Sequence, residues 1–568
     1  MSERHEISGR TWRGWILTAV LCFAAMGFAQ QPTPPAASAP QPGGQNQATE
    51  SDKSKTGTSM SPEQTRQLFA LVDDLIKFSS EETGLPIKSQ VNRQITSRAA
   101  VERYLSEKFA EDESARRMQR GEIVLKKFGL LDRGFDLKPF LLSLLKEQIE
   151  AYYDFKTKTI FMLDWVGIEE QKPVLAHELT HALQDQRSNL TKWNDQTPLD
   201  VSLDFAGDTD HVTKDEMDTA RQAVVEGQAT AVMLNYVLKP MGKSLAKNPE
   251  LLDAIKRQMS GSQDAPVLAR APLLLSESLL FPYREGMSFE QGVWMDQGQT
   301  AAFAGTLDRP PTSSWEIINP REYEMKHVPS VPVFPNIHPV VDALYKPYDI
   351  GQIGQLDVHV LAGIFGGDEA AADLTPAWNG GLYWAGQRLD AKTKAEQAST
   401  NSIALLYLSV WKSASSARSF ARLYADQLGH KYSGVRLESA SGSGDKSGRT
   451  PGFKVFPPPP SSNEDSENSD SPLGERVYST NEGPVVITTR DKMVFVSESF
   501  PLDMAHNLAT LILDAQGTGK VHLAQATQQD VPALKTEPLK PLTGSLVEFM
   551  SSCGVMKVAV DAAIQAGR

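Results

Sequence analysis

Two histidines and a glutamate in an H-E-x-x-H pattern have the types and spacing to bind and use a metal ion. His177 and His181 are four residues apart, and Glu178 lies between them. On a helix, residues four apart project from one face, so both imidazoles can bind one Zn²⁺ at about 2.0–2.1 Å. Glu178 is rotated by about 100° from His177. Its carboxylate can therefore act as general base toward a metal-activated water without being a ligand.

The neighbouring residues predict that this pattern lies on a buried helix. Residues 174–186 include no Gly or Pro and are rich in Ala, Leu, Glu and Gln, which favour a helix. Because the chain has ten His in 568 residues, chance gives on the order of 0.01 such matches. The alternative is a surface helix with two ordinary histidines, which the apolar Val174, Leu175, Leu179 and Leu183 argue against.

A third ligand is predicted on a second helix, expected over 214–238. Glu226 lies between apolar residues there, and a buried carboxylate is costly unless it is paired or bound to a metal. A salt bridge to an Arg and an exposed glutamate are the alternatives. Gly227 costs up to about 1 kcal/mol against Ala in mid-helix, which close approach of another backbone would explain. The competing ligand candidates are Asp208, Asp210, His211 and Asp218.

Four further residues are candidates to support the chemistry. Thr230, four residues after Glu226, and Asp185 could each hydrogen-bond a ligand imidazole from behind. Tyr283 and His327 are weak candidates to stabilise the oxyanion of a tetrahedral intermediate. The alternative for Thr230 and Asp185 is an ordinary solvated polar residue, and the alternative for Tyr283 and His327 is a structural role.

The two predicted helices together resemble the gluzincin branch of the zincin metallopeptidases. The strings Ala176–Gln186 and Val225–Thr230 also resemble a group of uncharacterised predicted metallopeptidases of bacteria and archaea. The resemblance covers about residues 140–325. It implies a zincin-like domain whose active-site helix lies beside a β-sheet edge, with Zn²⁺ held by two His and a Glu.

The chain departs from the known families at three positions. Thr230 stands where thermolysin-like enzymes usually have Asp. The resemblance therefore does not identify the residue that hydrogen-bonds the ligand histidines. The metzincin extension is absent, because Gln184 and Arg187 replace its Gly and its third His.

A β-hairpin is expected just before the H-E-x-x-H helix. Residues 148–155 and 159–163 are rich in aromatic and β-branched residues and flank the polar turn 156–158. One of these strands could form the sheet edge along the cleft and hold an extended peptide by main-chain pairing. The alternative is an interior hairpin without a binding role.

The N-terminus has the features of a secretory signal peptide. Arg4, Arg10 and Arg13 precede an apolar run from Trp15 to Ala29 that ends in small residues suitable for cleavage. An uncleaved anchor is the alternative. Removing residues 1–29 discards three Arg and two Glu, so the net charge changes from −13 to −14. This acidic balance disfavours nucleic-acid binding.

Composition and patterning divide the chain into six segments and predict an α+β fold. Cys553 is the single cysteine of the mature chain, so no intramolecular disulfide is possible. A helix is expected at 350–365, at the start of the second domain. The segments are a signal peptide at 1–29, a disordered linker at 30–60, the zincin-like domain at 61–328, a Pro-rich connection at 329–349, an α+β accessory domain at 350–515 with a disordered insertion at 441–471, and a tail at 516–568.

The sequence therefore predicts an exported zinc metallopeptidase, periplasmic or extracellular in a bacterium, that hydrolyses peptide or protein substrates. His177, His181 and Glu226 would hold one Zn²⁺, and Glu178 would be the general base. Two alternatives are a catalytically inactive zinc-binding envelope or scaffold protein, and a metal-dependent hydrolase of a non-peptide amide or ester. No stable membrane span is expected after signal cleavage, and the oligomeric state is not predicted.

Overall fold

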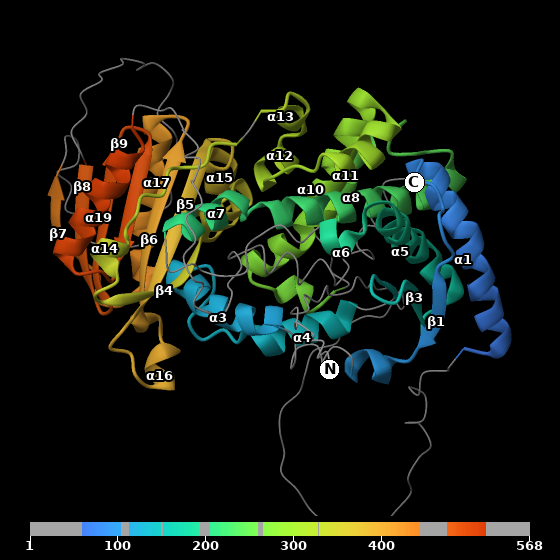
Figure 1. Cartoon of the computed structure of the whole chain (residues 1–568), viewed down its shortest axis with the longest axis horizontal. Helices are drawn as coiled ribbons and strands as arrows, with labels where there is room; N and C mark the ends of the chain where they lie inside the picture. The colour runs from blue at the N-terminus through green and yellow to red at the C-terminus, as the bar shows by residue number, and fades with distance from the viewer. Residues whose placement is uncertain are drawn as a thin grey trace, which may run out of the picture.

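The chain has an α+β fold in which a mostly helical part lies beside a seven-stranded sheet (Figure 1). The predicted signal peptide, Cys553, and nearly all of the linker, the insertion and the tail lie outside the described residues. The computed structural model describes residues 60–103, 113–148, 151–193, 205–259, 265–327, 329–441 and 474–517.

A three-stranded sheet lies beside the helix that carries the H-E-x-x-H pattern. Its strands are β1 (Asn92–Thr96), β2 (Ala151–Asp154) and β3 (Thr159–Leu163), in the order β1-β3-β2. β2 and β3 pair antiparallel, as the predicted hairpin requires, and β1 pairs parallel with β3. Because β3 is central, β2 is an edge strand, and it packs against α5 (Ile168–Ser188).

Four long helices form the core of the helical part. α1 (Pro62–Thr83) packs on α5, α5 packs on α8 (Met217–Leu238), and α8 packs on α10 (Leu273–Gln297). Most of the large apolar side chains of these helices belong to one buried core. The predicted second helix is confirmed as α8. It begins at Met217 and not at residue 214, because Lys214 is the last residue of a separate helix, Phe205–Lys214.

α5 begins earlier than the apolar run alone indicates. The Glu170 side chain accepts a hydrogen bond from the backbone N–H of Gly167, which fixes the first turn. Pro173 lies inside the helix and cannot donate a backbone hydrogen bond there. Asn189 ends the helix in the left-handed conformation, with φ of 49°.

Shorter elements complete the helical part. These are α3 (Glu113–Phe128), α4 (Leu137–Gln148), α6 (Leu190–Trp193), α7 (Phe205–Lys214), α9 (Glu250–Met259), α11 (Thr306–Asp308), α12 (Ser314–Ile318), α13 (Pro320–Glu324), 3₁₀ turns at Lys239–Met241 and Leu268–Arg270, and a π-helical turn at Ala301–Gly305.

The seven-stranded sheet is antiparallel throughout and has the strand order β4-β5-β6-β10-β9-β8-β7. Its strands are β4 (Tyr345–Gln352), β5 (Trp378–Arg388), β6 (Ile403–Trp411), β7 (Arg436–Ser441), β8 (Gly474–Thr480), β9 (Gly483–Arg490) and β10 (Met493–Glu498). α14 (His338–Val341) precedes β4, and α19 (Leu502–Ala515) follows β10. Between the strands lie α15 (Gln355–Leu374), α16 (Lys394–Gln397), a 3₁₀ turn at Thr400–Ser402, α17 (Ala414–Asp426) and α18 (Leu428–Lys431).

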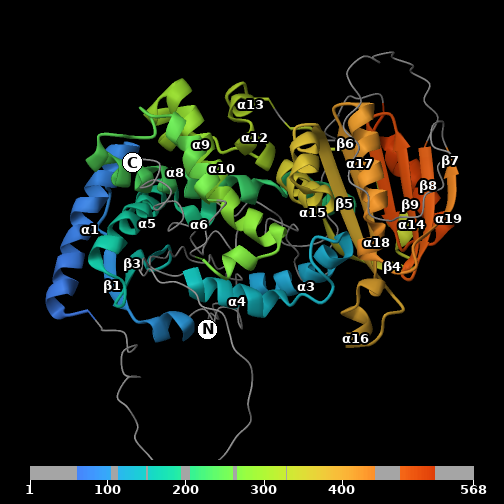
Figure 2. The same cartoon turned by 180° about the vertical axis from the view of Figure 1, so that it is seen from behind.

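Helices cover both faces of this sheet. α15 and α17 lie on the face seen in Figure 2, and α19 lies on the face seen in Figure 1. Alternate strand residues enter separate cores, so Tyr383 packs with the helical part of the chain whereas Leu382 and Trp384 pack with α19. The helical part meets the sheet where α7 packs on β4 and α10 packs on α15.

The prediction of a helix at 350–365 is wrong for the first residues of that range. Residues 350–352 belong to β4, which begins at Tyr345 inside the segment assigned to the connection, and α15 begins only at Gln355. The buried Ile350 pairs with Trp384 of β5, so tertiary pairing decides the conformation of this short apolar run. No helix among the described residues combines the length and apolarity needed to cross a membrane.

Candidate metal centre

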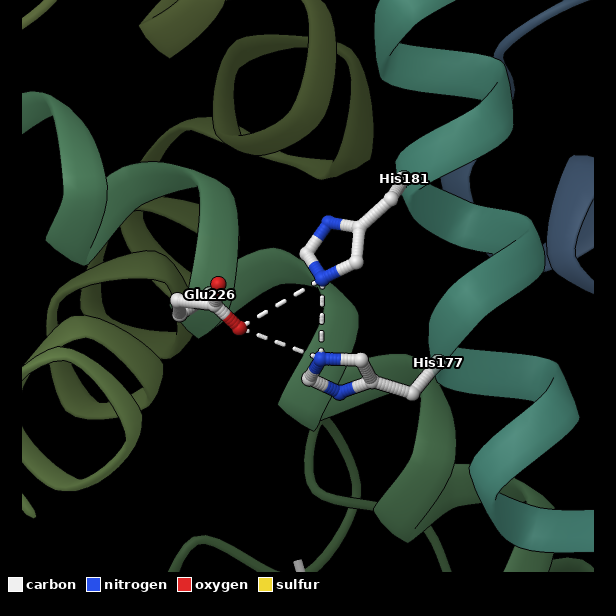
Figure 3. A group of neighbouring side chains, drawn as sticks. All are labelled: His177, His181 and Glu226. Carbon is white, nitrogen blue, oxygen red and sulfur yellow. Dashed lines mark hydrogen bonds and ion pairs between the residues drawn. The ribbon is translucent and has the colours of Figure 1, made fainter. Parts of the chain in front are cut away.

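Two helices bring the three predicted ligands together in the core of the helical part. His177 and His181 project from one face of α5, and Glu226 projects toward them from α8 (Figure 3). The two Nε2 atoms lie 2.9 Å apart. A carboxylate oxygen of Glu226 lies 3.1 Å from the Nε2 of His177 and 3.4 Å from that of His181.

This geometry fits a metal ion. Tetrahedral ligands at about 2.0–2.1 Å from an ion are separated by roughly 3.3 Å, close to the three observed separations. All three side chains are at most 1% exposed. Among the described residues, they are the group of His, Cys, Asp or Glu whose ligand atoms converge closely enough to hold an ion. The site could therefore bind a metal through two nitrogens and one oxygen.

The electrostatics of the site favour the ligand forms of His177 and Glu226. Burial, together with the nearby His181, lowers the pKa of His177 to about 4, so its imidazole is neutral at pH 7. Burial alone would raise the pKa of Glu226. The electrostatic and hydrogen-bond interactions with the two imidazoles outweigh that effect and lower the pKa of Glu226 to about 2. Metal ligands must be deprotonated in this way.

Glu178 lies beside this group without belonging to it. One of its carboxylate oxygens accepts a 2.9 Å hydrogen bond from the backbone N–H of Tyr153 on β2. The other oxygen is buried and has no hydrogen-bond partner among the described residues. Burial and the neighbouring charge of Glu226 raise the pKa of Glu178 well above its usual range. A carboxyl group placed in this way can accept and return a proton.

Two glutamines that the sequence analysis missed lie behind the ligands. The side-chain oxygen of Gln184 is 2.9 Å from the Nδ1 of His181. The amide of Gln222 donates a 2.9 Å hydrogen bond to the second carboxylate oxygen of Glu226, which directs the first oxygen toward the imidazoles. Gln184 is three residues after His181, and Gln222 is four before Glu226. Helical spacing places both glutamines within reach of a ligand, but it does not distinguish Gln184 from its neighbour Asp185.

The residues predicted for this supporting role do not have it. Asp185 instead accepts hydrogen bonds from the Tyr153 hydroxyl, the Lys158 ammonium and the backbone of Leu190. The Thr230 hydroxyl is buried without a hydrogen-bond partner among the described residues. Both predictions were wrong because helical spacing places a residue on a face but does not choose its partner.

The two candidates for oxyanion stabilisation differ in their position. Tyr283 is buried on α10, and its ring stacks on His177 with centroids 6.2 Å apart. The imidazole of His327 is 57% exposed and pairs with Glu322. Because the metal-binding group is almost completely buried, Tyr283 is beside the site and the exposed His327 is outside it.

The four competing ligands have other partners. Asp208 lies 3.0 Å from the Nε2 of His338, and His211 lies 3.5 Å from Asp215. Asp210 forms an ion pair with Lys214. Asp218 is near the charged Arg221, at the start of α8.

Gly227 allows α8 and α10 to cross closely beside the ligand Glu226. A Cβ atom at Gly227 would lie 2.2 Å from the carbonyl carbon of Gly286, and one at Gly286 would lie 2.1 Å from the Ala223 oxygen. The close backbone approach expected from the sequence is therefore confirmed. This close crossing fixes the position of Glu226 relative to α10.

Comparisons of the chain with protein-family models, curated proteins and solved structures found no match. The functional argument therefore rests on the site itself.

Proposed function

We propose that this protein is a zinc metallopeptidase of the gluzincin type. His177, His181 and Glu226 would hold one Zn²⁺, and Glu178 would be the catalytic general base. The observation that carries the proposal is the convergence of three ligand atoms beside a fourth, non-ligating carboxylate. Two His and one Glu are a ligand set used by catalytic zinc sites in peptidases.

The division of roles follows from the protein's own side chains. A divalent cation at this site would lower the pKa of a water molecule and polarise a carbonyl oxygen. Glu178 would take a proton from that water molecule while the water oxygen forms a bond to the carbonyl carbon. Glu178 would then deliver this proton to the leaving nitrogen as the carbon–nitrogen bond breaks. The Tyr153 N–H holds one oxygen of Glu178, which leaves the other for proton transfer.

The edge strand β2 supports a peptide as substrate. The N–H of Tyr153 points away from β3 and toward Glu178, so the outer edge of β2 lies beside the proposed base. Main-chain groups on such an edge can pair with an extended peptide. We propose the hydroxyl of the buried Tyr283, whose ring stacks on His177, as the group that stabilises the oxyanion.

We also propose that the protein is exported, because its first 29 residues have the pattern of a signal peptide. A zincin-like arrangement of the helical domain is part of the same proposal. It is supported by the order of strand pair, α5 and α8 along the chain.

Metal content and chelator-sensitive hydrolysis of the full mature chain test the proposal together. We expect one zinc per chain and cleavage of an unfolded, fluorescently labelled protein. Cleavage should stop after chelation and return with added Zn²⁺. Hydrolysis of amide or ester probes but of no peptide would replace the peptidase with another metal hydrolase. Bound zinc without any hydrolysis would identify an inactive metal-binding protein, and failure to bind metal would overturn the proposal.

A further inference from the structure

A chain of hydrogen bonds connects His181 to backbone carbonyls more than 100 residues further along the sequence. The Nδ1 of His181 contacts the Gln184 side-chain oxygen, and the Gln184 amide donates to the side-chain oxygen of Gln228 over 2.9 Å. The Gln228 amide in turn donates to the carbonyls of Ala302 and Phe303, both over 3.0 Å. Both glutamine side chains are fully buried.

The carbonyl end of this chain fixes the orientation of Gln228. Backbone carbonyls can only accept hydrogen bonds, so the group of Gln228 that faces Ala302 and Phe303 must be its NH₂. With the amide reversed, its oxygen would lie about 3 Å from two other oxygens. The side-chain oxygen of Gln228 is therefore directed at Gln184. The two carbonyls belong to the π-helical turn Ala301–Gly305.

The orientation of Gln184 follows from the same reasoning. Its NH₂ group donates to the oxygen of Gln228 and to the carbonyl of Val225, 3.0 Å away. Both partners are acceptors, so the Gln184 oxygen must face His181. An amide oxygen can only accept, and the Nδ1 of His181 must therefore carry the proton.

We propose that Gln184 and Gln228 are positioning residues that keep the proton of His181 on Nδ1 and so leave the Nε2 lone pair free for a metal ion. The inference rests on metal binding at the proposed site, but it does not require hydrolysis. The π-helical turn thereby sets the tautomer of a ligand through two side chains.

Gln184→Met tests the proposal, because it keeps the length of the side chain and removes both the acceptor and the donors. We expect the affinity for Zn²⁺, measured by competition with a chelator, to fall 10–100-fold, the usual effect of removing such a partner. Gln171→Met is the matched control. Gln171 is an equally buried glutamine of α5, but it hydrogen-bonds Leu163 and Val166 instead. Its variant should lose stability and keep the affinity of the wild type.

Two further variants separate positioning from general damage to the fold. Gln184→Glu keeps an acceptor for the Nδ1 proton but loses the donors to Val225 and Gln228, so it should retain more affinity than Gln184→Met. Gln228→Met should weaken binding in the same direction as Gln184→Met, and it replaces that test if Gln184→Met does not fold. The absorption spectrum of bound Co²⁺ should change in Gln184→Met and stay the same in Gln171→Met.

The outcomes distinguish this inference from the proposed function. If the wild type binds no metal, the proposed function fails before the glutamines are tested. If the wild type binds Zn²⁺ and Gln184→Met and Gln171→Met bind it equally well, the positioning role is refuted while the metal site stands.

Discussion

The backbone N–H of Tyr153 donates a hydrogen bond to a side-chain oxygen of Glu178 over 2.9 Å, joining the edge strand β2 to the helix of the candidate metal site. This contact holds a fully buried carboxyl group in one orientation. It also places the proposed general base directly beside the proposed substrate-binding edge of β2.

Glu178→Gln should separate hydrolysis from metal binding. The amide keeps the size of the side chain and can still accept from Tyr153, but it cannot take a proton from water. Because general acid–base catalysis contributes 10²–10⁴-fold, we expect kcat to fall by at least 100-fold while one zinc per chain remains. Single-turnover hydrolysis and metal analysis measure the two quantities. Wild-type turnover in this variant would exclude Glu178 as the base.

Glu226→Gln should weaken metal binding while preserving the fold. An amide oxygen is a much poorer ligand than a carboxylate, so we expect at least a 100-fold loss of affinity for Zn²⁺ in a chelator competition. Glu216→Gln is the control, because Glu216 is also buried at the start of α8 but bonds to Ser314. Equal affinities in the two variants would remove Glu226 from the ligand set.

Gly227→Ala should destabilise the protein because the new Cβ would overlap the backbone of Gly286 at 2.2 Å. Backbone cannot move aside as a flexible side chain can, so we expect a loss of about 3 kcal/mol or more in denaturant unfolding. Gly121→Ala is the matched control, since Gly121 is also within a helix but has open space around it. Alanine there should stabilise by up to about 1 kcal/mol. Similar stabilities would show that α8 and α10 can separate without cost.

Asp349→Asn should change how stability depends on pH. Burial raises the pKa of Asp349 to about 7, helped by Asp215 and opposed by the charge of His211. The folded state therefore holds this proton more tightly than the unfolded state, whose pKa is 3.8. Its contribution to stability is complete below about pH 4 and is lost as the pH rises to about 7, at up to about 1.4 kcal/mol per pH unit.

The Asn variant carries no such proton, so its unfolding free energy should exceed that of the wild type at pH 8 and lose this advantage at pH 4. Asp368→Asn, on the exposed side of α15, is the control and should follow the wild type at both pH values. If the unfolding free energies of Asp349→Asn and the wild type changed with pH in parallel, the raised pKa of Asp349 would be contradicted.

Helical spacing predicted the two helices of the candidate site, because a pattern of period 3.6 is carried by the residues themselves. The same spacing, together with the cost of a mid-helix glycine, predicted the close approach at Gly227. The partner of His181 was missed, since Asp185 and Gln184 are neighbours on one helix and only packing against α8 determines which of them faces the imidazole. The contribution of the π-helical turn had no local signal, because it depends on contacts with residues far along the chain.

The first strand of the seven-stranded sheet, β4, was missed for a related reason. Residues 350–365 combine a strand end with a helix start, and the apolar run has no period that separates the two. Pairing of β4 with β5, more than 30 residues later, decides the conformation.

The side chains of His177, His181 and Glu226 are at most 1% exposed, which affects how quickly any ion could be exchanged. Three such side chains can release an ion completely only by moving away from it, and their burial allows that movement only when neighbouring parts of the protein open. Its residence time would then be governed by the rate of local opening as well as by the strength of its bonds. A chelator should therefore remove it at a rate that becomes independent of chelator concentration.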